Sequence, residues 1–249
     1  MVATGRVYQP GFAVYITLAI TMKQERLPTF ISYLGLVLTA ASVFASIAQY
    51  RAADLQAKAA VIALMPQIEV RALLEKIDSD KYTDSRVEVM SDGGPIYNFN
   101  LSRRSWIEFK VGKTIAYRQP LVGYYFVEYR TGHTKGPITT LKGYRNNEAF
   151  FDFLRWAQPS LGSDTEILQP VTLLRMTYND ALKQENLNYV LLSGGSVTHL
   201  SEDDGTKLWD RRSEEERTNL PIDISQLKTE SSVAEKLAIW KSEIAEARK

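Results

Sequence analysis

The chain of 249 residues contains no cysteine and only two histidines, His133 and His199. The lack of cysteine excludes disulfides, a thiol nucleophile and thiolate metal ligands, and it leaves the redox compartment undecided. A zinc site needs three or four ligands, and neither histidine belongs to an HExxH or other histidine-rich pattern. We therefore predict no metal site and no cofactor.

Signatures of phosphate binding and hydrolysis are also missing, since there is no Walker loop, no dinucleotide-binding glycine fingerprint and no GxSxG elbow. The 30 basic and 29 acidic residues give a net charge of +1, which argues against a nucleic-acid partner recruited by bulk charge. No EF-hand pattern surrounds Glu202-Asp203-Asp204, so we interpret this run as a solvated hairpin turn before Gly205. Catalytic residues are unknown, and a site assembled from distant positions stays open.

Charged residues are absent from residues 27–50, a stretch of 24 residues between Arg26 and Arg51. About 20 apolar residues in a helix cross a hydrocarbon core of about 30 Å. We therefore predict a single-pass transmembrane helix here, with the lipid bilayer as its partner. A cleaved signal peptide and a buried core helix are the alternative interpretations. Basic residues lie on both sides of the stretch, so the side on which the soluble domain lies is undetermined.

The leader, residues 1–26, has two interpretations. Residues 11–22 are apolar but short for a span, which fits an interfacial segment, a second short membrane segment that forms a helical hairpin, or a strand. Alternatively, translation begins at Met22, because Met22 and the charged residues after it resemble the start of an anchored protein. Residues 1–21 would then be a non-native extension.

Residues 51–65 are rich in strong helix formers and predict a juxtamembrane helix that ends before Pro66. Five small or apolar residues, from just before this segment into it, follow a 4-3-4-3 spacing: Ala48, Ala52, Leu55, Ala59 and Ile62. This spacing suits a short coiled-coil seam, and hence a homo-oligomer formed through the juxtamembrane helix. Alanine at most of the positions favours a helix that packs on its own domain instead.

Beyond Pro66 the hydrophobic period changes to two, which predicts a β-rich globular domain over residues 66–212. The predicted strands are 66–74, 86–90, 96–101, 106–111, 122–130, 171–178, 189–192 and 197–200. Glycine-containing turns separate them, among them Ser91-Asp92-Gly93-Gly94-Pro95 and Ser193-Gly194-Gly195-Ser196. Many short strands at about ten-residue spacing are typical of a sandwich or barrel, so the fold class is mostly β.

The membrane helix is followed by a proline-led strand, the turn Gly93-Gly94-Pro95 ahead of Asn98, and later Tyr178-Asn179-Asp180 before a hairpin. In this order the chain resembles a group of uncharacterised bacterial single-pass membrane-anchored proteins. The resemblance implies an immunoglobulin-like β-sandwich with accessory helices, anchored in the bacterial inner membrane, and no activity. It covers residues 66–100 and 170–200, and this chain has Ile96 where the group usually has alanine.

A helix is predicted at residues 147–157, capped by Asn146 or Asn147 and stopped by Pro159. One face of this helix is aromatic. We favour packing of that face over a sheet, and exposure to an unknown protein partner is the alternative.

The chain ends in a linker and amphipathic helix, residues 213–249. The charge cluster at 210–218 is interpreted as solvated linker, and Ser232 with Glu235 as a capping box. This helix either packs back on the domain, which we favour, or binds a partner. The candidate partner surface of the two helices consists of Phe150, Phe153, Trp156 and Trp240.

Two function classes follow from these predictions. The first is a membrane-anchored β-rich interaction or sensory module, and the alternative is a membrane-tethered enzyme or effector with an unrecognised site. A deep pocket with convergent polar groups would favour the second class. A shallow aromatic surface without perturbed ionisable groups would favour the first.

Overall fold

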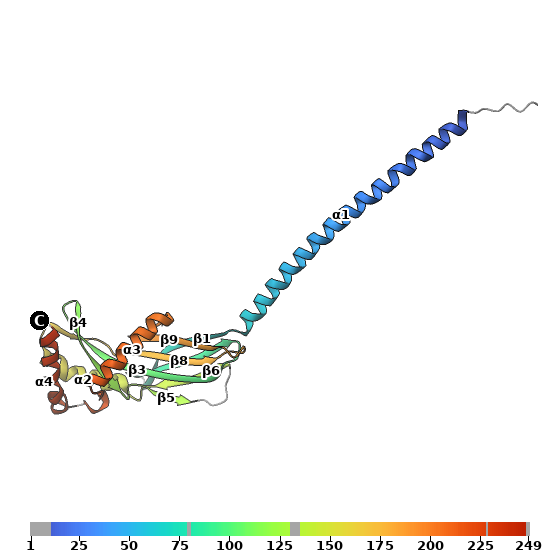
Figure 1. Cartoon of the computed structure of the whole chain (residues 1–249). Coiled ribbons are helices and arrows are strands. Elements are labelled where there is room, and N and C mark those ends of the chain that lie inside the picture. The colour runs from blue at the N-terminus through green and yellow to red at the C-terminus, as the bar shows by residue number, and fades with distance from the viewer. Residues whose placement is uncertain (1–10, 79–80, 130–134, 228, 248–249) are drawn as a thin grey trace, which may run out of the picture. The chain divides into compact units, whose positions relative to one another are not determined.

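The computed structural model describes residues 11–78, 81–129, 135–227 and 229–247. The chain divides between Val61 and Ile62 into two units, a long helix and a β-rich unit, and Figure 1 draws both. His133, one of the two histidines, lies outside the described residues.

Helix α1 extends over Gly11–Leu64 and includes the predicted transmembrane and juxtamembrane segments as well as part of the leader. Its segment Ile31–Leu64 is the one described helix that is long and apolar enough to cross a membrane, a property it shares with signal sequences. The Thr39 hydroxyl donates to the Gly35 carbonyl at 2.8 Å, so this polar side chain is satisfied within the helix. Pro66 then begins a strand, which explains where the helix ends.

Two sheets make up the β-rich unit within the described residues. The four-stranded sheet has the order β1-β2-β6-β5. Its strands are β1 (Pro66–Asp78), β2 (Lys81–Gly93), β6 (Gly136–Lys142) and β5 (Phe126–Tyr129). All pairings in this sheet are antiparallel.

The seven-stranded sheet has the order β10-β9-β8-β3-β4-β11, and β7 also pairs with β3. Its strands are β3 (Tyr97–Val111), β4 (Thr114–Val122), β7 (Thr165–Ile167), β8 (Val171–Asn179), β9 (Glu185–Ser193), β10 (Ser196–Leu200) and β11 (Ile222–Asp223). Only β11 pairs in parallel among the described strands, with β4.

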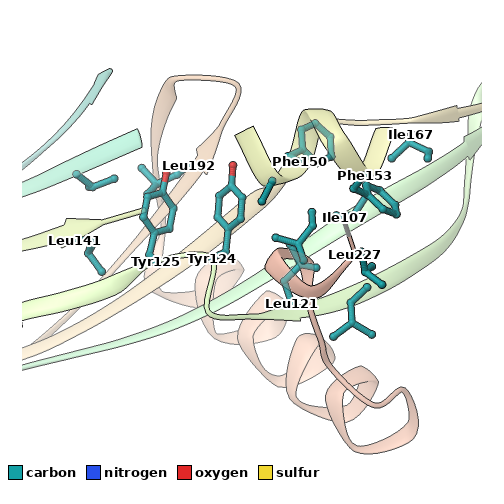
Figure 2. Close-up of a cluster of buried hydrophobic side chains, with 14 of the residues drawn as sticks. Ile107, Leu121, Tyr124, Tyr125, Leu141, Phe150, Phe153, Ile167, Leu192 and Leu227 are labelled. Carbon is teal, nitrogen blue, oxygen red and sulfur yellow. The ribbon is translucent and has the colours of Figure 1, made fainter. Parts of the chain in front are cut away.

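The main core draws buried side chains from both sheets, and Figure 2 shows part of it. Alternate residues point inward along each strand, as the period of two requires. The four-stranded sheet contributes Val70, Val87, Val89 and Leu141, and the other sheet contributes Leu101, Ile107, Phe109, Leu174, Met176, Val190 and Leu192. The prediction of a mostly β unit preceded by a long apolar helix is therefore confirmed.

Helices complete the unit. Helix α2 (Asn146–Leu161) packs against β2, β7, the short 3-10 helix η1 (Ile224–Gln226) and α4 (Glu230–Ala247). Helix α3 (Glu202–Thr218) lies across β8 and β9 (Figure 1). Leu208 and Trp209 of α3 pack there on a second cluster that contains Leu173 and Tyr189.

The strands differ from prediction in the middle of the chain. One continuous strand, β3, replaces the two predicted at 96–101 and 106–111. The predicted strand at 122–130 is correct only over β5, Phe126–Tyr129, because the chain turns at Gly123, whose φ is +71°, after β4 ends at Val122. Strand β4 was not predicted, because Arg118-Gln119-Pro120 has the composition of a turn. In the structure this segment is part of the strand, and Pro120 pairs with Trp106 of β3.

The predicted acidic turn and charged linker are both helical, which corrects the interpretation of residues 202–218. Ser201 caps α3, and its hydroxyl accepts from the backbone N–H of Asp204 at 3.2 Å. The acidic run thus occupies the first turn, where negative charge complements the helix dipole. The interpretation failed because only two large apolar side chains hold this charge-rich helix to the sheet.

Helix ends also differ in detail from the predictions. Helix α2 starts after Arg145, which has a left-handed conformation, and it passes through Pro159 before it ends. At the start of α4, the backbone N–H of Thr229 donates to the Ser232 hydroxyl at 3.2 Å and that of Ser232 donates to the Thr229 hydroxyl at 3.3 Å. The reciprocal capping box therefore lies one turn before the predicted Ser232–Glu235 pair.

The turn at Gly93-Gly94-Pro95 carries the chain from β2 in one sheet to β3 in the other. Gly93 has the positive φ, +80°, and Gly94 does not. Gly94 is required for a different reason, because a Cβ atom there would overlap the carbonyl oxygen of Leu64. Its N–H donates to the Met65 carbonyl at 3.2 Å.

Candidate ligand cavity

A cavity of about 420 Å³ opens in the β-rich unit, a volume within the usual range for small-molecule sites. Strand β1 contributes Ala72, Leu73 and Leu74 to its lining, and the β9–β10 hairpin contributes residues 193–196. Further lining comes from the start of α2 and from residues just before β5. The cavity therefore lies among elements of both sheets.

Small inward-facing side chains create this space. Ala72 continues the inward row of Ile68 and Val70 on β1, and Ser85 continues that of Val87 on β2. On the opposite sheet, Thr172 stands in line with the core residues Leu174 and Met176. Since each of these positions carries a side chain smaller than its neighbours in the row, the sheets do not fill the gap between them.

Thr172 is buried in spite of its hydroxyl. That hydroxyl and the Ser105 hydroxyl lie 2.8 Å apart, across the β3–β8 pair in which the two residues are partners. The wall of the cavity therefore contains a satisfied polar pair, whose burial costs little.

The hairpin that closes one side has the geometry its sequence predicted. Gly194 and Gly195 both have positive φ, +54° and +82°, between the paired residues Ser193 and Ser196. A two-residue loop with positive φ at both positions is a type I′ turn, which favours glycine. The predicted turn at these residues is confirmed.

Large apolar side chains remain exposed at the cavity. Leu74 is 58% exposed and Phe151, on α2, is 61% exposed, and both belong to the lining. Apolar surface of this kind favours contact with an apolar molecule over contact with water.

A chain of uncharged polar groups lies on another side of the cavity. The hydroxyls of Ser85 and Tyr124 both donate to Asn147 Oδ1, at 3.1 Å and 3.3 Å. Tyr125 is hydrogen-bonded to Ser85. The Tyr124 and Tyr125 rings lie 5.1 Å apart, and Figure 2 shows their hydroxyl groups directed to the same side. These four side chains, Ser85, Tyr124, Tyr125 and Asn147, are called the polar cluster below.

The two tyrosines of the polar cluster stay protonated at neutral pH. Burial raises the pKa of Tyr124 well above its ordinary value of 10, and the neighbouring Tyr125 adds to the shift. Burial also raises the pKa of Tyr125, and its hydrogen bond with Ser85 opposes that shift. Both shifts move the pKa further above neutral pH, so the phenols stay uncharged and serve as hydrogen-bonding groups rather than as general bases.

The start of α2 depends on a separate asparagine. Asn146 is buried, its side-chain N–H donates to the Tyr124 carbonyl at 3.0 Å, and its Oδ1 accepts from the Ser85 backbone N–H at 3.1 Å. It therefore ties the first residue of α2 to two segments that line the cavity. Predicted as a helix cap, Asn146 instead fixes the position of its neighbour Asn147.

The residues predicted as a partner surface lie mainly inside the unit. Phe150 and Phe153 are 3% and 0% exposed, Trp240 is 1% exposed, and Trp156 is half-buried against the core. The rings of Phe153 and Trp240 meet edge to face at 5.5 Å. Phe150 is the one member that lines the cavity. The set is therefore part of the core, where the aromatic faces of α2 and α4 pack, rather than an exposed surface.

The polar cluster escaped prediction from the sequence. Asn147 was interpreted only as a cap, Tyr124 and Tyr125 fell inside a predicted strand, and Ser85 bordered another. The feature of the sequence that indicates such a cluster is the pair of adjacent tyrosines after Gly123, since buried phenols need hydrogen-bond partners. His199, the one described histidine, is exposed on β10, and the described residues hold no group of three or more potential metal ligands.

Comparison with known proteins gives no family for this chain. No protein-family model matches it, and no curated protein matches it. The features that bear on function are therefore the cavity and α1.

Proposed function

We propose that the protein is a membrane-anchored binding module with a sensory role, whose β-rich unit takes up a small, uncharged, mainly apolar molecule. The observation that carries this proposal is the cavity, because every described side chain that lines it is uncharged while apolar side chains stand exposed beside it. An apolar molecule that enters such a site leaves water without the cost of an unpaired buried charge.

A cavity with polar groups is also one criterion for the alternative, a membrane-tethered enzyme or effector. The described lining supplies hydroxyls and amides but no carboxylate, imidazole or amine. The raised pKa values of Tyr124 and Tyr125 favour binding over proton transfer at neutral pH. The binding module is thus the better-supported class.

The anchoring half of the proposal rests on α1. Its exposed apolar segment supports a single pass through a membrane. The resemblance to bacterial anchored proteins with an immunoglobulin-like sandwich extends the proposal to the bacterial inner membrane. Within it, a partner protein that reads the ligand-bound state, and a second copy paired through residues 51–65, are further expectations.

Photolabelling of the full chain in detergent micelles tests the binding proposal. We expect an uncharged long-chain methyl ether that carries a diazirine to label peptides from the cavity as well as α1, which the micelle contacts. Ser196→Trp should reduce cavity labelling severalfold, because Ser196 lines the cavity. The matched control is Thr198→Trp, since Thr198 is also exposed on β10 but lies outside the lining. Cavity labelling no stronger than that of other exposed strands, by this ether and by the corresponding long-chain alcohol alike, would refute the proposal.

Replacement of Leu36 by Arg tests the anchor. A charge near the centre of a span costs about 2.5–3.5 kcal/mol on insertion scales, so we expect a smaller fraction of the protein to resist alkaline carbonate extraction. Leu36→Val, which keeps the position apolar, should behave like the parent. Complete release of the parent chain by carbonate would contradict a membrane span.

A further inference from the structure

The polar cluster has a definite donor and acceptor pattern. The hydroxyl hydrogens of Ser85 and Tyr124 are both directed to one acceptor, Asn147 Oδ1. A hydroxyl has one hydrogen and two lone pairs, so the Tyr124 oxygen keeps its lone pairs, and the Ser85 oxygen, which is also hydrogen-bonded to Tyr125, keeps one. What they present to a molecule in the cavity is therefore acceptor capacity.

A bound molecule complements these acceptor oxygens best with a group that donates a hydrogen bond. An ether or an ester offers only acceptors, and against the Ser85 and Tyr124 oxygens it leaves unpaired acceptors out of water. A carboxylate offers only acceptors too, and no described lining residue carries a positive charge to balance it. An alcohol hydroxyl donates one hydrogen bond and stays uncharged.

The rest of the cavity is suited to the hydrocarbon part of such a molecule. Leu73, Leu74 and Phe151 are exposed apolar lining residues, and Phe150 and Leu192 are buried ones. The lining thus offers apolar contacts in addition to the polar cluster, as expected for a ligand with a polar group on a hydrocarbon body.

From this arrangement we infer that the ligand is an uncharged apolar alcohol, whose hydroxyl group donates to the polar cluster and whose hydrocarbon part contacts Leu73, Leu74 and Phe151. The inference rests on the proposed binding function and adds the chemical class of the ligand. Because a hydrogen-bonding site discriminates strongly against an analogue that leaves its polar groups unpaired, the hydroxyl also accounts for selectivity among apolar molecules.

Three diazirine probes of equal chain length test the inference on the full chain in micelles: a long-chain alcohol, its methyl ether and the corresponding carboxylate. Cavity labelling is divided by α1 labelling in the same sample, which corrects for partition into the micelle. We expect the alcohol to label the cavity about fivefold more than the ether, the factor that one hydrogen bond supplies. The carboxylate should label it less than the alcohol at neutral pH.

Tyr124→Phe removes the phenol oxygen with little change in size, and the alcohol-to-ether ratio should fall below about two. Tyr97→Phe is the matched control, because Tyr97 is exposed and lies outside the lining, and it should keep the parent ratio. Equal labelling of the parent by alcohol and ether, or preference for the carboxylate, would overturn the ligand class while the binding function stands. Absence of cavity labelling by all three probes would overturn both.

Discussion

Replacement of Gly94 by Val should destabilise the β-rich unit by about 1–3 kcal/mol, the usual cost of a side chain forced into occupied space. The Cβ of any other residue at Gly94 would overlap the carbonyl oxygen of Leu64, which is backbone and cannot rotate away. The shift needed would also break the hydrogen bond of 3.2 Å from the Gly94 N–H to the Met65 carbonyl. Urea denaturation of a fragment of residues 51–249, which retains the end of α1, measures the effect.

Two comparisons isolate the cause. Asp92→Ser replaces an exposed residue of the same connection by a small polar one. Its free energy of unfolding should stay within about 0.5 kcal/mol of that of the parent. In a fragment of residues 67–249 both Leu64 and Met65 are missing, so Gly94→Val should cost much less there. An equal loss in both fragments would mean that the contact with Leu64 is not the cause.

The parts of the fold that the sequence predicted are those set by local pattern. Alternation of Ile68, Val70 and Ala72 predicted β1, and paired glycines at Gly194 and Gly195 predicted the β9–β10 turn. Each of these signals lies within a few neighbouring residues, because strand period and turn chemistry are local properties.

Helix α3 was missed because its evidence is not local. Its charges form pairs one turn apart, such as Lys207 with Asp203 and Arg217 with Glu214, and in sequence they resemble a solvated linker. What keeps it helical is Trp209, which packs beside Tyr189 at 6.4 Å and under the Arg104 guanidinium at 4.5 Å. Tyr189 comes from β9, two elements earlier, and Arg104 comes from β3, far away in the chain.

The cavity was unpredictable for a related reason. Ala72, Ser85 and Thr172 are ordinary strand residues when each is taken alone. They leave a space only because the fold brings three small inward-facing positions to the same region. The polar cluster likewise joins residues of β2, the start of α2 and the segment before β5, so no local sequence pattern predicts it.

The C-terminal helix was expected to pack back on its domain, and the structure confirms this expectation. Val233, Trp240 and Ile244 are all buried, as their spacing on one helical face requires. Trp240 lies 5.3 Å from the Phe109 ring, and its indole N–H donates to Gln119 Oε1 at 2.9 Å. It thereby attaches α4 to both β3 and β4.

Trp240→Ala should accordingly have the largest effect of any substitution considered, about 3–5 kcal/mol, as for other buried aromatic residues cut back to alanine. Most of the loss is packing against Phe109 and Phe153, since Gln119 Oε1 also accepts from the Tyr117 hydroxyl at 3.2 Å and keeps one partner. Trp240→Phe retains a ring and should cost clearly less. The measurement is urea denaturation of the 51–249 fragment.

The adjacent residue provides the control for this experiment. Ile239 is 52% exposed on the same helix, so Ile239→Ala removes apolar surface from α4 without opening a cavity, and we expect a loss below about 1 kcal/mol. If Trp240→Ala unfolds at the parent midpoint, α4 does not contribute to the core. If Ile239→Ala and Trp240→Ala cost the same, the helix packs through a different face.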